Sequence, residues 1–433
     1  MPLRLRLHAA FLDLPSVELH CTAGFLQCWY DLASVNAAHP TVTLSSSQIR
    51  YPLCAMMDQR KQLLVDADVW IVKVGSRSLT GDDGLLDREQ VANLARQLVK
   101  LVELGKRVVL VSSGAVASGV GRLGLPNRPT DLATLQAVAA IGQTHLIQVY
   151  EQTFSQFNRF AAQVLLTASE LDDRVAYLNV RNTLNRLLEM GCIPIINEND
   201  TVAVDELKTT FGDNDRLAGM VAGLLEGSLL VILSDVRGLY DRDPSDANAN
   251  VITSVPKIDE SVEELVRDRK TGVSKGGMAS KLSTAKFVTM SGQSVVIAWG
   301  REPDVLLRLS RGEEIGTVFL PQSKTLPPRK RWIGFSAQTA GRLIVDQGAV
   351  TAMLTNGRSL LPIGIQSVEG EFGKGDVVSV HAIDGTEIAR GLVNYSADQL
   401  LRIRGCRSDR IEQILGQCPY EEVIHRDNLT VHS

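Results

Sequence analysis

The stretch Leu229-Leu230-Val231-Ile232-Leu233-Ser234-Asp235-Val236-Arg237-Gly238-Leu239-Tyr240 indicates the fold class of this chain. Its first five residues are apolar and predict a buried strand, and Ser234 and Asp235 follow at the carboxyl end of that strand. Gly238 then permits a tight turn. Because ligands of open α/β sheets bind outside the carboxyl ends of the strands, we expect this strand to end at a binding site.

A second stretch, Lys275-Gly276-Gly277-Met278-Ala279-Ser280-Lys281, carries groups that suit an anion. Adjacent glycines let backbone N–H groups approach an anion closely, and the lysine that follows them can neutralise it. An acid at a strand end, together with a glycine pair flanked by lysines, predicts a site for a nucleoside triphosphate.

Apolar strands alternate with helical stretches along the middle of the chain. The expected strands cover residues 69–74, 107–111, 192–196, 229–233 and 295–298. Between the first two, Asp87 and Gln90 have capping-box spacing at the start of a helix that Gly105 ends. The alternation predicts an α/β fold, with a mostly parallel open sheet sandwiched by helices.

Length, composition and charge exclude several classes of protein. The 433 residues are enough for two domains, and 44% apolar with 22% charged residues is ordinary for a globular protein. The net charge of −4 gives no electrostatic reason for nucleic-acid binding. No run of about 18 apolar residues occurs, so no membrane span is predicted. The six cysteines show no metal-ligand spacing, which favours free thiols and a cytoplasmic protein.

The chain divides into five segments that differ in composition and in the periodicity of their apolar residues. Residues 1–65 keep no helical or strand period, and we interpret them as a non-native or disordered extension: either a mis-assigned start near Met56-Met57 or a genuine disordered or targeting segment. Residues 66–320 form the catalytic α/β domain, and the proline-rich residues 321–332 a linker. Short strands punctuated by glycines predict a small, barrel-like β module over 333–418, followed by a tail over 419–433. A chain that ends near Leu320 is therefore expected to keep its chemistry.

One motif matches a nucleotide-binding pattern that we reject. Gly119-Val120-Gly121-Arg122-Leu123-Gly124 has the spacing of the dinucleotide fingerprint, which must directly follow a strand. Here the preceding strand ends at Val111, and Ser112-Ser113-Gly114 already occupies the turn. A P-loop sequence is absent as well.

Six motifs, taken together, resemble those of the amino-acid kinase family. They are Val72-Lys73-Val74-Gly75-Ser76, Ser112-Ser113-Gly114-Ala115, Asn197-Glu198-Asn199-Asp200, Gly212-Asp213-Asn214-Asp215, Ser234-Asp235 and Gly276-Gly277-Met278 with Lys281. The C-terminal β module resembles the PUA domain that the glutamate-phosphorylating branch of the family carries. The resemblance covers everything except the first 65 or so residues.

The resemblance implies ATP-dependent phosphorylation of the γ-carboxylate of L-glutamate, the first step of proline biosynthesis. Such an enzyme is a phosphotransferase with a carboxyl group as acceptor, and it uses ATP with Mg²⁺. The resemblance also implies homo-oligomers and feedback inhibition by proline at a site that overlaps the glutamate site. A downstream glutamyl-phosphate reductase is expected, because the acyl phosphate product is labile.

The chemistry explains which residue types the site needs. The γ-carboxylate has an ordinary pKa of about 4.3, so it is already an ionised nucleophile and catalysis must come from positioning and charge cancellation. We predict Lys73, Lys281 and Asp215 as catalytic residues, with Asp215 holding the two lysines. Predicted ATP-binding residues are Lys73, Ser234, Asp235, Lys275, Gly276, Gly277, Met278, Ala279, Ser280 and Lys281; predicted glutamate-binding residues are Ser113, Asp200 and Asn214. No metal ligands are predicted, since Mg²⁺ is expected to bind the phosphates of ATP.

Several residues keep a second interpretation. Asp213 is as well explained by a helix cap as by a ligand. Tyr240 either packs near the adenine or covers the edge of the sheet, and His145 is interpreted as structural.

Two other functions stay open. Residues 329–433 contain 12 Lys and Arg against 12 Asp and Glu, a net charge of zero, so RNA binding by the β module ranks below a structural or regulatory role. Another amino-acid kinase, such as an aspartate or N-acetylglutamate kinase, is the nearer alternative, and the β module favours the glutamate enzyme.

Overall fold

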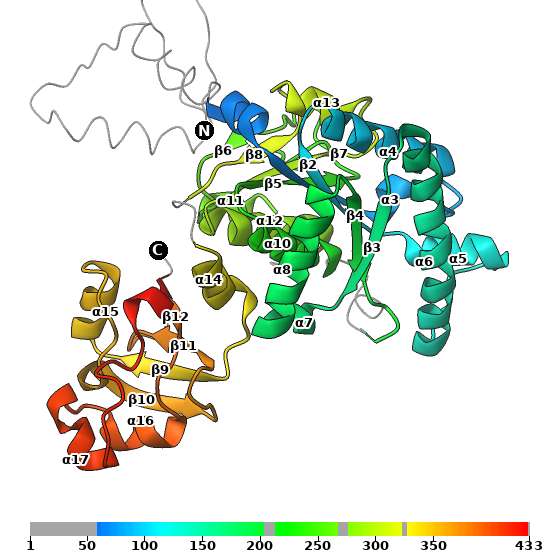
Figure 1. Cartoon of the computed structure of the whole chain (residues 1–433). Coiled ribbons are helices and arrows are strands. Elements are labelled where there is room, and N and C mark those ends of the chain that lie inside the picture. Colours follow the sequence, from blue (N-terminus) through cyan, green and yellow to red (C-terminus); the bar gives the residue numbers. More distant parts are fainter. Residues whose placement is uncertain (1–58, 203–212, 267–275, 323–326, 432–433) are drawn as a thin grey trace, which may run out of the picture. The chain divides into compact units, whose positions relative to one another are not determined.

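The computed structural model describes residues 59–202, 213–266, 276–322 and 327–431, and its larger domain is built on one eight-stranded sheet (Figure 1). The strand order is β3-β4-β2-β1-β5-β7-β8-β6, with parallel pairing from β3 through β7 and β8 antiparallel to β7. The predicted mostly parallel open sheet is therefore confirmed. The strands are β1 (Val69–Val74), β2 (Arg107–Ser112), β3 (Ala161–Leu166), β4 (Ile193–Glu198), β5 (Ser228–Ser234), β6 (Ser254–Val255), β7 (Ser294–Trp299) and β8 (Thr317–Phe319).

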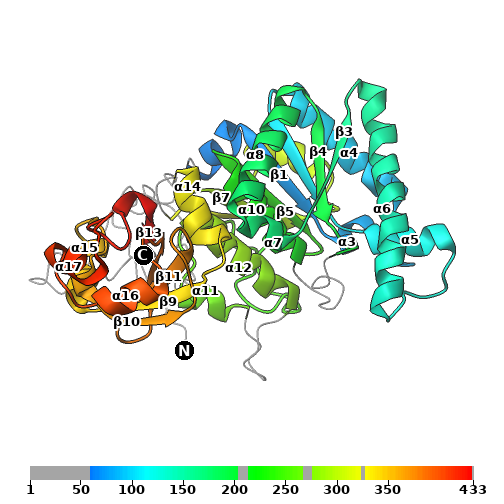
Figure 2. The ribbon, with the colours of Figure 1, turned by 60° about the horizontal axis from the view of Figure 1, so that its bottom comes forward.

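Helices cover both faces of this sheet (Figure 2). Alternate residues of each strand point to opposite faces, so each strand contributes to two cores. In β1, Trp70 and Val72 pack in the core that contains α4, α6 and α13, whereas Val69 and Ile71 pack in the core that contains α8, α10 and α12. The helices are α3 (Ser76–Leu79), α4 (Arg88–Glu103), α5 (Ala115–Leu123), α6 (Leu132–Phe154), α7 (Ala168–Asp172), α8 (Arg174–Glu189), α10 (Asp213–Leu224), α11 (Glu260–Glu264), α12 (Gly276–Met290) and α13 (Val305–Ser310).

The first long helix, α4, begins at the expected cap but not with the expected box. The Asp87 side chain accepts a hydrogen bond from the Gln90 backbone N–H at 3.0 Å. The Gln90 side chain does not return to Asp87; it donates to the carbonyl oxygen of Gly300 at 2.8 Å. A tertiary acceptor thus replaces the local one and ties α4 to the end of β7. Gly105 follows the helix with a φ of 84°, as expected for a terminating glycine.

The rejected glycine motif lies in helix α5, where its glycines allow close packing. A Cβ atom on Gly119 would overlap the carbonyl oxygen of Val138 in α6, and one on Gly142 of α6 would overlap the carbonyl oxygen of Ala115. Gly119 and Gly142 therefore let α5 and α6 approach backbone to backbone. The structure agrees with the rejection of a dinucleotide loop at this motif.

The folded chain extends further toward the N-terminus than the expected boundary at residue 65. Residues 59–66 form a helix whose Leu64 is fully buried in the core beside α4. Arg60 of this helix donates hydrogen bonds to the carbonyl oxygens of Thr253, Glu313 and Ile315. The segment is too short for its period to stand out in the sequence, which explains the misplaced boundary.

The expected linker is not a free connection. Its described part includes α14 (Pro328–Arg331), followed by a π-helix (Trp332–Ser336). Arg331, Trp332 and Ile333 are all buried, and the last two belong to the core that contains α8, α10 and α12. The polar, proline-rich sequence at 321–331 does not indicate this contribution, because consecutive apolar residues begin only at Trp332.

The C-terminal module is the predicted small β domain with its own core. Its five strands pair in the order β10-β9-β11-β12-β13. The sheet continues past the expected end at residue 418, because β13 pairs with β12. The elements are β9 (Gly341–Val345), α15 (Gln347–Leu354), β10 (Ile365–Gly370), β11 (Val377–His381), β12 (Glu387–Leu392), α16 (Ala397–Ile403), α17 (Ile411–Leu415) and β13 (Leu429–Val431). Across the described ranges, no helix has the length and apolar character that a membrane crossing requires.

Candidate active site

One cavity of about 290 Å³ lies at the carboxyl ends of β1, β2 and β5, where the first turns of α10 and α12 also meet. The sheet topology produces this meeting point, because neighbouring parallel strands end at the same edge. The cavity is lined by Lys73, Gly75, Ser76, Arg77, Ser78, Ser113, Asn214, Asp215, Leu233, Ser234, Asp235, Val236, Gly277, Met278 and Lys281. The strand end at Ser234 and Asp235 and the glycine-rich stretch with Lys281 therefore lie at one site.

Two lysines share one buried carboxylate in this cavity. Lys73 Nζ lies 2.6 Å from Asp215 Oδ1, and Lys281 Nζ lies 3.3 Å from Asp215 Oδ2. Asp215 is 2% exposed. It sits in the first turn of α10, where the helix dipole favours a negative charge. Two ammonium groups against one carboxylate leave one positive charge facing the cavity, which suits an anionic ligand.

A chain of buried amides fixes the orientation of Asn214. Its Nδ2 donates to Ser113 Oγ at 2.9 Å and to Asn197 Oδ1 at 3.2 Å. The Asn197 amide in turn donates to Gln143 Oε1 at 2.7 Å and accepts from the backbone N–H of Glu198. That N–H cannot be reversed, so it sets the direction of the whole chain.

Gln143 belongs to no recognisable motif and was not predicted. It lies next to Gly142, whose missing side chain brings α6 against the start of α5. The glycine is the only signal for it in the sequence, and that signal has meaning only once the helix packing is known.

Asp200 follows β4 and does not line the cavity described above. Burial, and next the carboxylate of Glu198, raise the pKa of Asp200 to about 6, and Arg128 opposes them. Asp200 lies two residues beyond the end of β4, the strand that carries Asn197 of the amide chain.

The Ser234–Asp235 strand end holds a carboxylate that is paired on both oxygens. Ser234 Oγ donates to Asp235 Oδ1 at 3.0 Å, and Arg77 Nη1 donates to Asp235 Oδ2 at 2.8 Å. Partial burial raises the pKa of Asp235, but these two hydrogen bonds, a backbone hydrogen bond and the charge of Arg77 together lower it below its ordinary value. Arg77 was not predicted, because it lies just after the motif Val72-Lys73-Val74-Gly75-Ser76, in a helix of one turn.

The glycine-rich stretch is only partly described. Gly277, Met278 and Lys281 line the cavity, and Lys281 Nζ also donates to the carbonyl oxygen of Gly277 at 3.1 Å. Ala279 and Ser280 lie in the same first turns of α12 without lining the cavity, and Gly276 begins that helix. Lys275 lies outside the described residues.

The structure gives the positions of three further residues, Asp213, Tyr240 and His145. Asp213 is the first residue of α10. Tyr240 forms an isolated antiparallel bridge with Val251, beside the sheet. His145 Nδ1 lies 2.9 Å from Ser118 Oγ in the contact between α6 and α5, a structural position.

Within the described ranges no group of three His, Cys, Asp or Glu side chains could hold a metal. The two carboxylates that line the cavity, Asp215 and Asp235, are already engaged by Lys73, Lys281 and Arg77.

Comparisons with known proteins agree with this architecture. Residues 68–298 match the model of the amino acid kinase family, and residues 341–415 match that of the PUA domain. A protein named glutamate 5-kinase from Rhodopirellula baltica is 50% identical over 86% of this chain and 96% of its own length. Proteins of the same name from Syntrophus aciditrophicus and Thioalkalivibrio sulfidiphilus are 47% and 48% identical, each over 87% of this chain and over 97% and 100% of their own lengths.

A solved structure, UMP kinase from Bacillus anthracis, aligns with 59% of this chain and 97% of its own at 14% identity and a TM-score of 0.39. The family model covers more than half of this chain, and the relatives match it over nearly their full lengths. The chain belongs to the amino acid kinase family.

Proposed function

We propose that this protein transfers the γ-phosphoryl group of ATP to the γ-carboxylate of L-glutamate, forming L-glutamyl 5-phosphate and ADP, the first step of proline biosynthesis. The observation that carries the proposal is the pair of lysines on one buried carboxylate, set in a cavity between the strand ends and the glycine-rich turn. The relatives that are identical to this chain at about half of the aligned positions are named glutamate 5-kinase, which supports glutamate as the acceptor.

In the proposed reaction the site brings two anions together. The glutamate carboxylate attacks the γ-phosphorus in line, and the bond from that phosphorus to the β,γ-bridging oxygen breaks, so the electron pair leaves with ADP. No general base is needed, because the carboxylate is ionised at neutral pH. Lys73 and Lys281 stabilise the charge that spreads over the transferring group, and Asp215 holds both ammonium groups in place.

The two substrates occupy different sides of Lys73. ATP lies along Ser234, Asp235 and the first turn of α12, and Mg²⁺ bound with the nucleotide would supply further charge neutralisation. Glutamate lies toward Ser113, Asn214 and Asp200, where an ionised Asp200 pairs with its α-ammonium group. The amide chain through Asn197 keeps Asn214 in one orientation for this contact.

The proposal includes the wider biology that the family resemblance implies. The protein acts in the cytoplasm as a homo-oligomer, proline inhibits it at a site overlapping the glutamate site, and a glutamyl-phosphate reductase consumes the product. The PUA domain has a structural or regulatory role rather than binding RNA, which is supported by the zero net charge of residues 329–433.

The decisive experiment compares acceptors side by side. ADP formation from ATP and Mg²⁺ is measured with L-glutamate, L-aspartate and N-acetyl-L-glutamate, and hydroxylamine traps the acyl phosphate. We expect turnover with glutamate to exceed that with the other two by at least about a hundredfold. Preference for aspartate or N-acetylglutamate would assign the chain to another amino-acid kinase.

A further inference from the structure

Side chains from three parts of the chain bind the carboxyl end of helix α10. Arg331 Nη1 donates to the carbonyl oxygen of Leu225 at 3.1 Å, and Gln293 Nε2 donates to the same oxygen at 2.8 Å. The Tyr177 hydroxyl donates to the carbonyl oxygen of Gly223 at 3.0 Å. The last carbonyls of a helix have no partner within it, and a cation at this end is favoured by the helix dipole.

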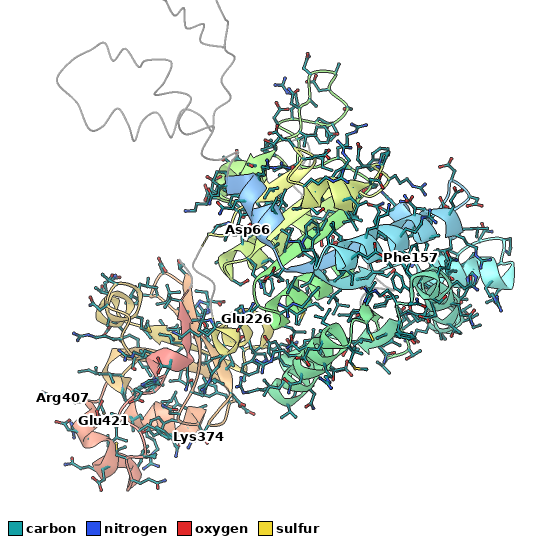
Figure 3. All side chains as sticks on the ribbon, turned by 45° about the horizontal axis from the view of Figure 1, so that its top comes forward. Asp66, Phe157, Glu226, Lys374, Arg407 and Glu421 are labelled. Carbon is teal, nitrogen blue, oxygen red and sulfur yellow. The ribbon has the colours of Figure 1, made fainter. Side chains whose placement is uncertain are left out.

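Arg331 is an unusual residue for such a cap, because its charge is buried. The residue is 1% exposed, and burial lowers the pKa of its guanidinium, opposed by the nearby Tyr177 and Glu226. Glu226, labelled in Figure 3, directly follows the capped end of α10. Within the described part of the chain, Nε and Nη2 of Arg331 have no hydrogen-bond partner. The end of α10 is therefore the main polar support of this buried charge.

The segment that carries Arg331 is held firmly in place. Trp332 packs edge-on against Tyr177, with ring centroids 6.4 Å apart, and the Arg174 guanidinium lies 5.2 Å from the Trp332 ring. α14 lies beside α10 in both ribbon views (Figures 1 and 2). Thr430 of the C-terminal domain donates to the carbonyl oxygen of Lys330 at 2.7 Å. The cap thus belongs to the segment that joins the two domains.

The opposite end of α10 carries two residues of the candidate active site, Asn214 and Asp215. A helix of this length spans about 18 Å and moves as a stiff body, so a displacement at one end is felt at the other. Asp215 holds both lysines, so a small shift of the helix changes both ion pairs at once.

We propose that Arg331 is a positioning residue for phosphoryl transfer: by binding the carboxyl end of α10, it sets where the opposite end of that helix holds Asp215 and Asn214. The inference rests on the proposed function for the identity of the reaction, but not for the mechanical link. It also revises the expectation that a chain ending near Leu320 keeps its chemistry, because such a chain lacks Arg331 and Trp332.

The test compares two buried arginines in the full-length protein. Arg331→Met removes the charge and the donors, Arg331→Lys keeps the charge, and Arg60→Met removes an equally buried arginine that caps carbonyls away from α10. We measure kcat and KM for glutamate and ATP well below the melting temperature, and hydrogen exchange of the first-turn amides of α10.

We expect Arg331→Met to lower kcat/KM for glutamate about tenfold and to speed exchange in the first turn of α10, and Arg331→Lys to recover part of both effects. Arg60→Met should lower the melting temperature and leave both readouts within about twofold of wild type, because it does not touch α10. Should Arg331→Met not fold, Tyr177→Phe removes only the hydroxyl at the same helix end and should change both readouts in the same direction.

Folded variants at Arg331 or Tyr177 with wild-type kinetics and wild-type exchange in the first turn would overturn the inference. The same holds if Arg60→Met changes the first turn of α10 as much as Arg331→Met does. Exchange needs no substrate, so the link through α10 is tested even if the wild-type protein turns over a different amino acid, an outcome that would overturn the proposed function alone.

Discussion

The ammonium group of Lys73 lies 2.6 Å from the carboxylate of Asp215, and both groups are almost completely buried. Lys73 is the penultimate residue of a strand in the middle of the sheet, and Asp215 lies in the first turn of a helix that covers one face of it. A buried ion pair costs desolvation free energy and stabilises a fold little, so a second cation on the same carboxylate, Lys281, points to a role in binding anions.

Removal of either lysine should reduce turnover far more than stability. Lys73→Ala and Lys281→Ala are each expected to lower kcat by about a hundredfold or more, because each removes about 3–4 kcal/mol of transition-state stabilisation. Steady-state kinetics measures this at saturating ATP and glutamate. The matched control is Lys286→Ala, because Lys286 lies on α12 with Lys281 but forms an exposed ion pair with Glu263 of α11. This variant should leave kcat unchanged. A kcat within tenfold of wild type for either site variant would contradict the assigned role.

Residues on the amino-acid side should affect glutamate and spare ATP. Asn214→Ala and Asp200→Ala are expected to raise KM for glutamate about tenfold or more while the affinity for ATP stays within about twofold, because they remove fixed polar partners of the substrate. Calorimetric titration with a non-hydrolysable ATP analogue measures the affinity for the nucleotide. Loss of analogue binding before any change in KM for glutamate would place these residues at the nucleotide instead.

Asp200 should make stability depend on pH. Its pKa of about 6 in the folded chain lies above that of an ordinary Asp, so folding binds this proton more tightly. The stability that protonated Asp200 contributes is full below about pH 4 and is lost as the pH rises through 6. Asp200→Asn removes this loss, and we expect it to raise the free energy of unfolding by about 1–3 kcal/mol at pH 7.5 and far less near pH 4.5. Urea unfolding at the two pH values measures this, and an equal change at both would be the contrary result.

Two glycines of one motif should respond in opposite ways to alanine. Gly119→Ala is expected to destabilise the protein by several kcal/mol, because its Cβ would overlap the Val138 carbonyl and force α5 and α6 apart. At Gly121 a Cβ would meet only the Leu85 side chain at 3.5 Å, so Gly121→Ala should be neutral or stabilise the helix by up to about 1 kcal/mol. Thermal unfolding of the two variants separates them. Similar melting temperatures would mean that helix packing does not explain the motif.

The helix over residues 59–66 should be necessary for stability, and the residues before Met57 should be dispensable. A protein that starts at Met57 keeps Arg60 and Leu64, and we expect it to match the full chain in melting temperature and turnover. A protein that starts at Asp68 loses the three carbonyl contacts of Arg60 and the buried Leu64, and should be clearly less stable. Soluble expression and melting temperature of both proteins distinguish these outcomes, and instability of the Met57 version would refute the boundary.

Features that depend on neighbouring residues could be predicted from the sequence. The strand from Leu229 to Leu233 is apolar throughout because helices cover both of its faces, and Asp87 caps α4 through a contact three residues away. The ligand-binding edge followed from the same local signals, because parallel strands that precede polar turns end at one edge. The resemblance to a known family named the pair of lysines and Asp215.

Contacts between distant segments could not be read in the same way, because no local pattern encodes which segments meet. Gln143 reaches Asn197 only because two glycines bring α6 against α5, and Arg77 meets Asp235 across two strand ends. Arg331 falls in the predicted proline-rich linker, yet its guanidinium is buried at the end of α10. Periodicity and motif spacing are short-range properties of the sequence, whereas these contacts depend on how helices and strands pack in three dimensions. That packing alone brings Arg331 to the carboxyl end of α10, whose opposite end carries Asp215 of the candidate active site.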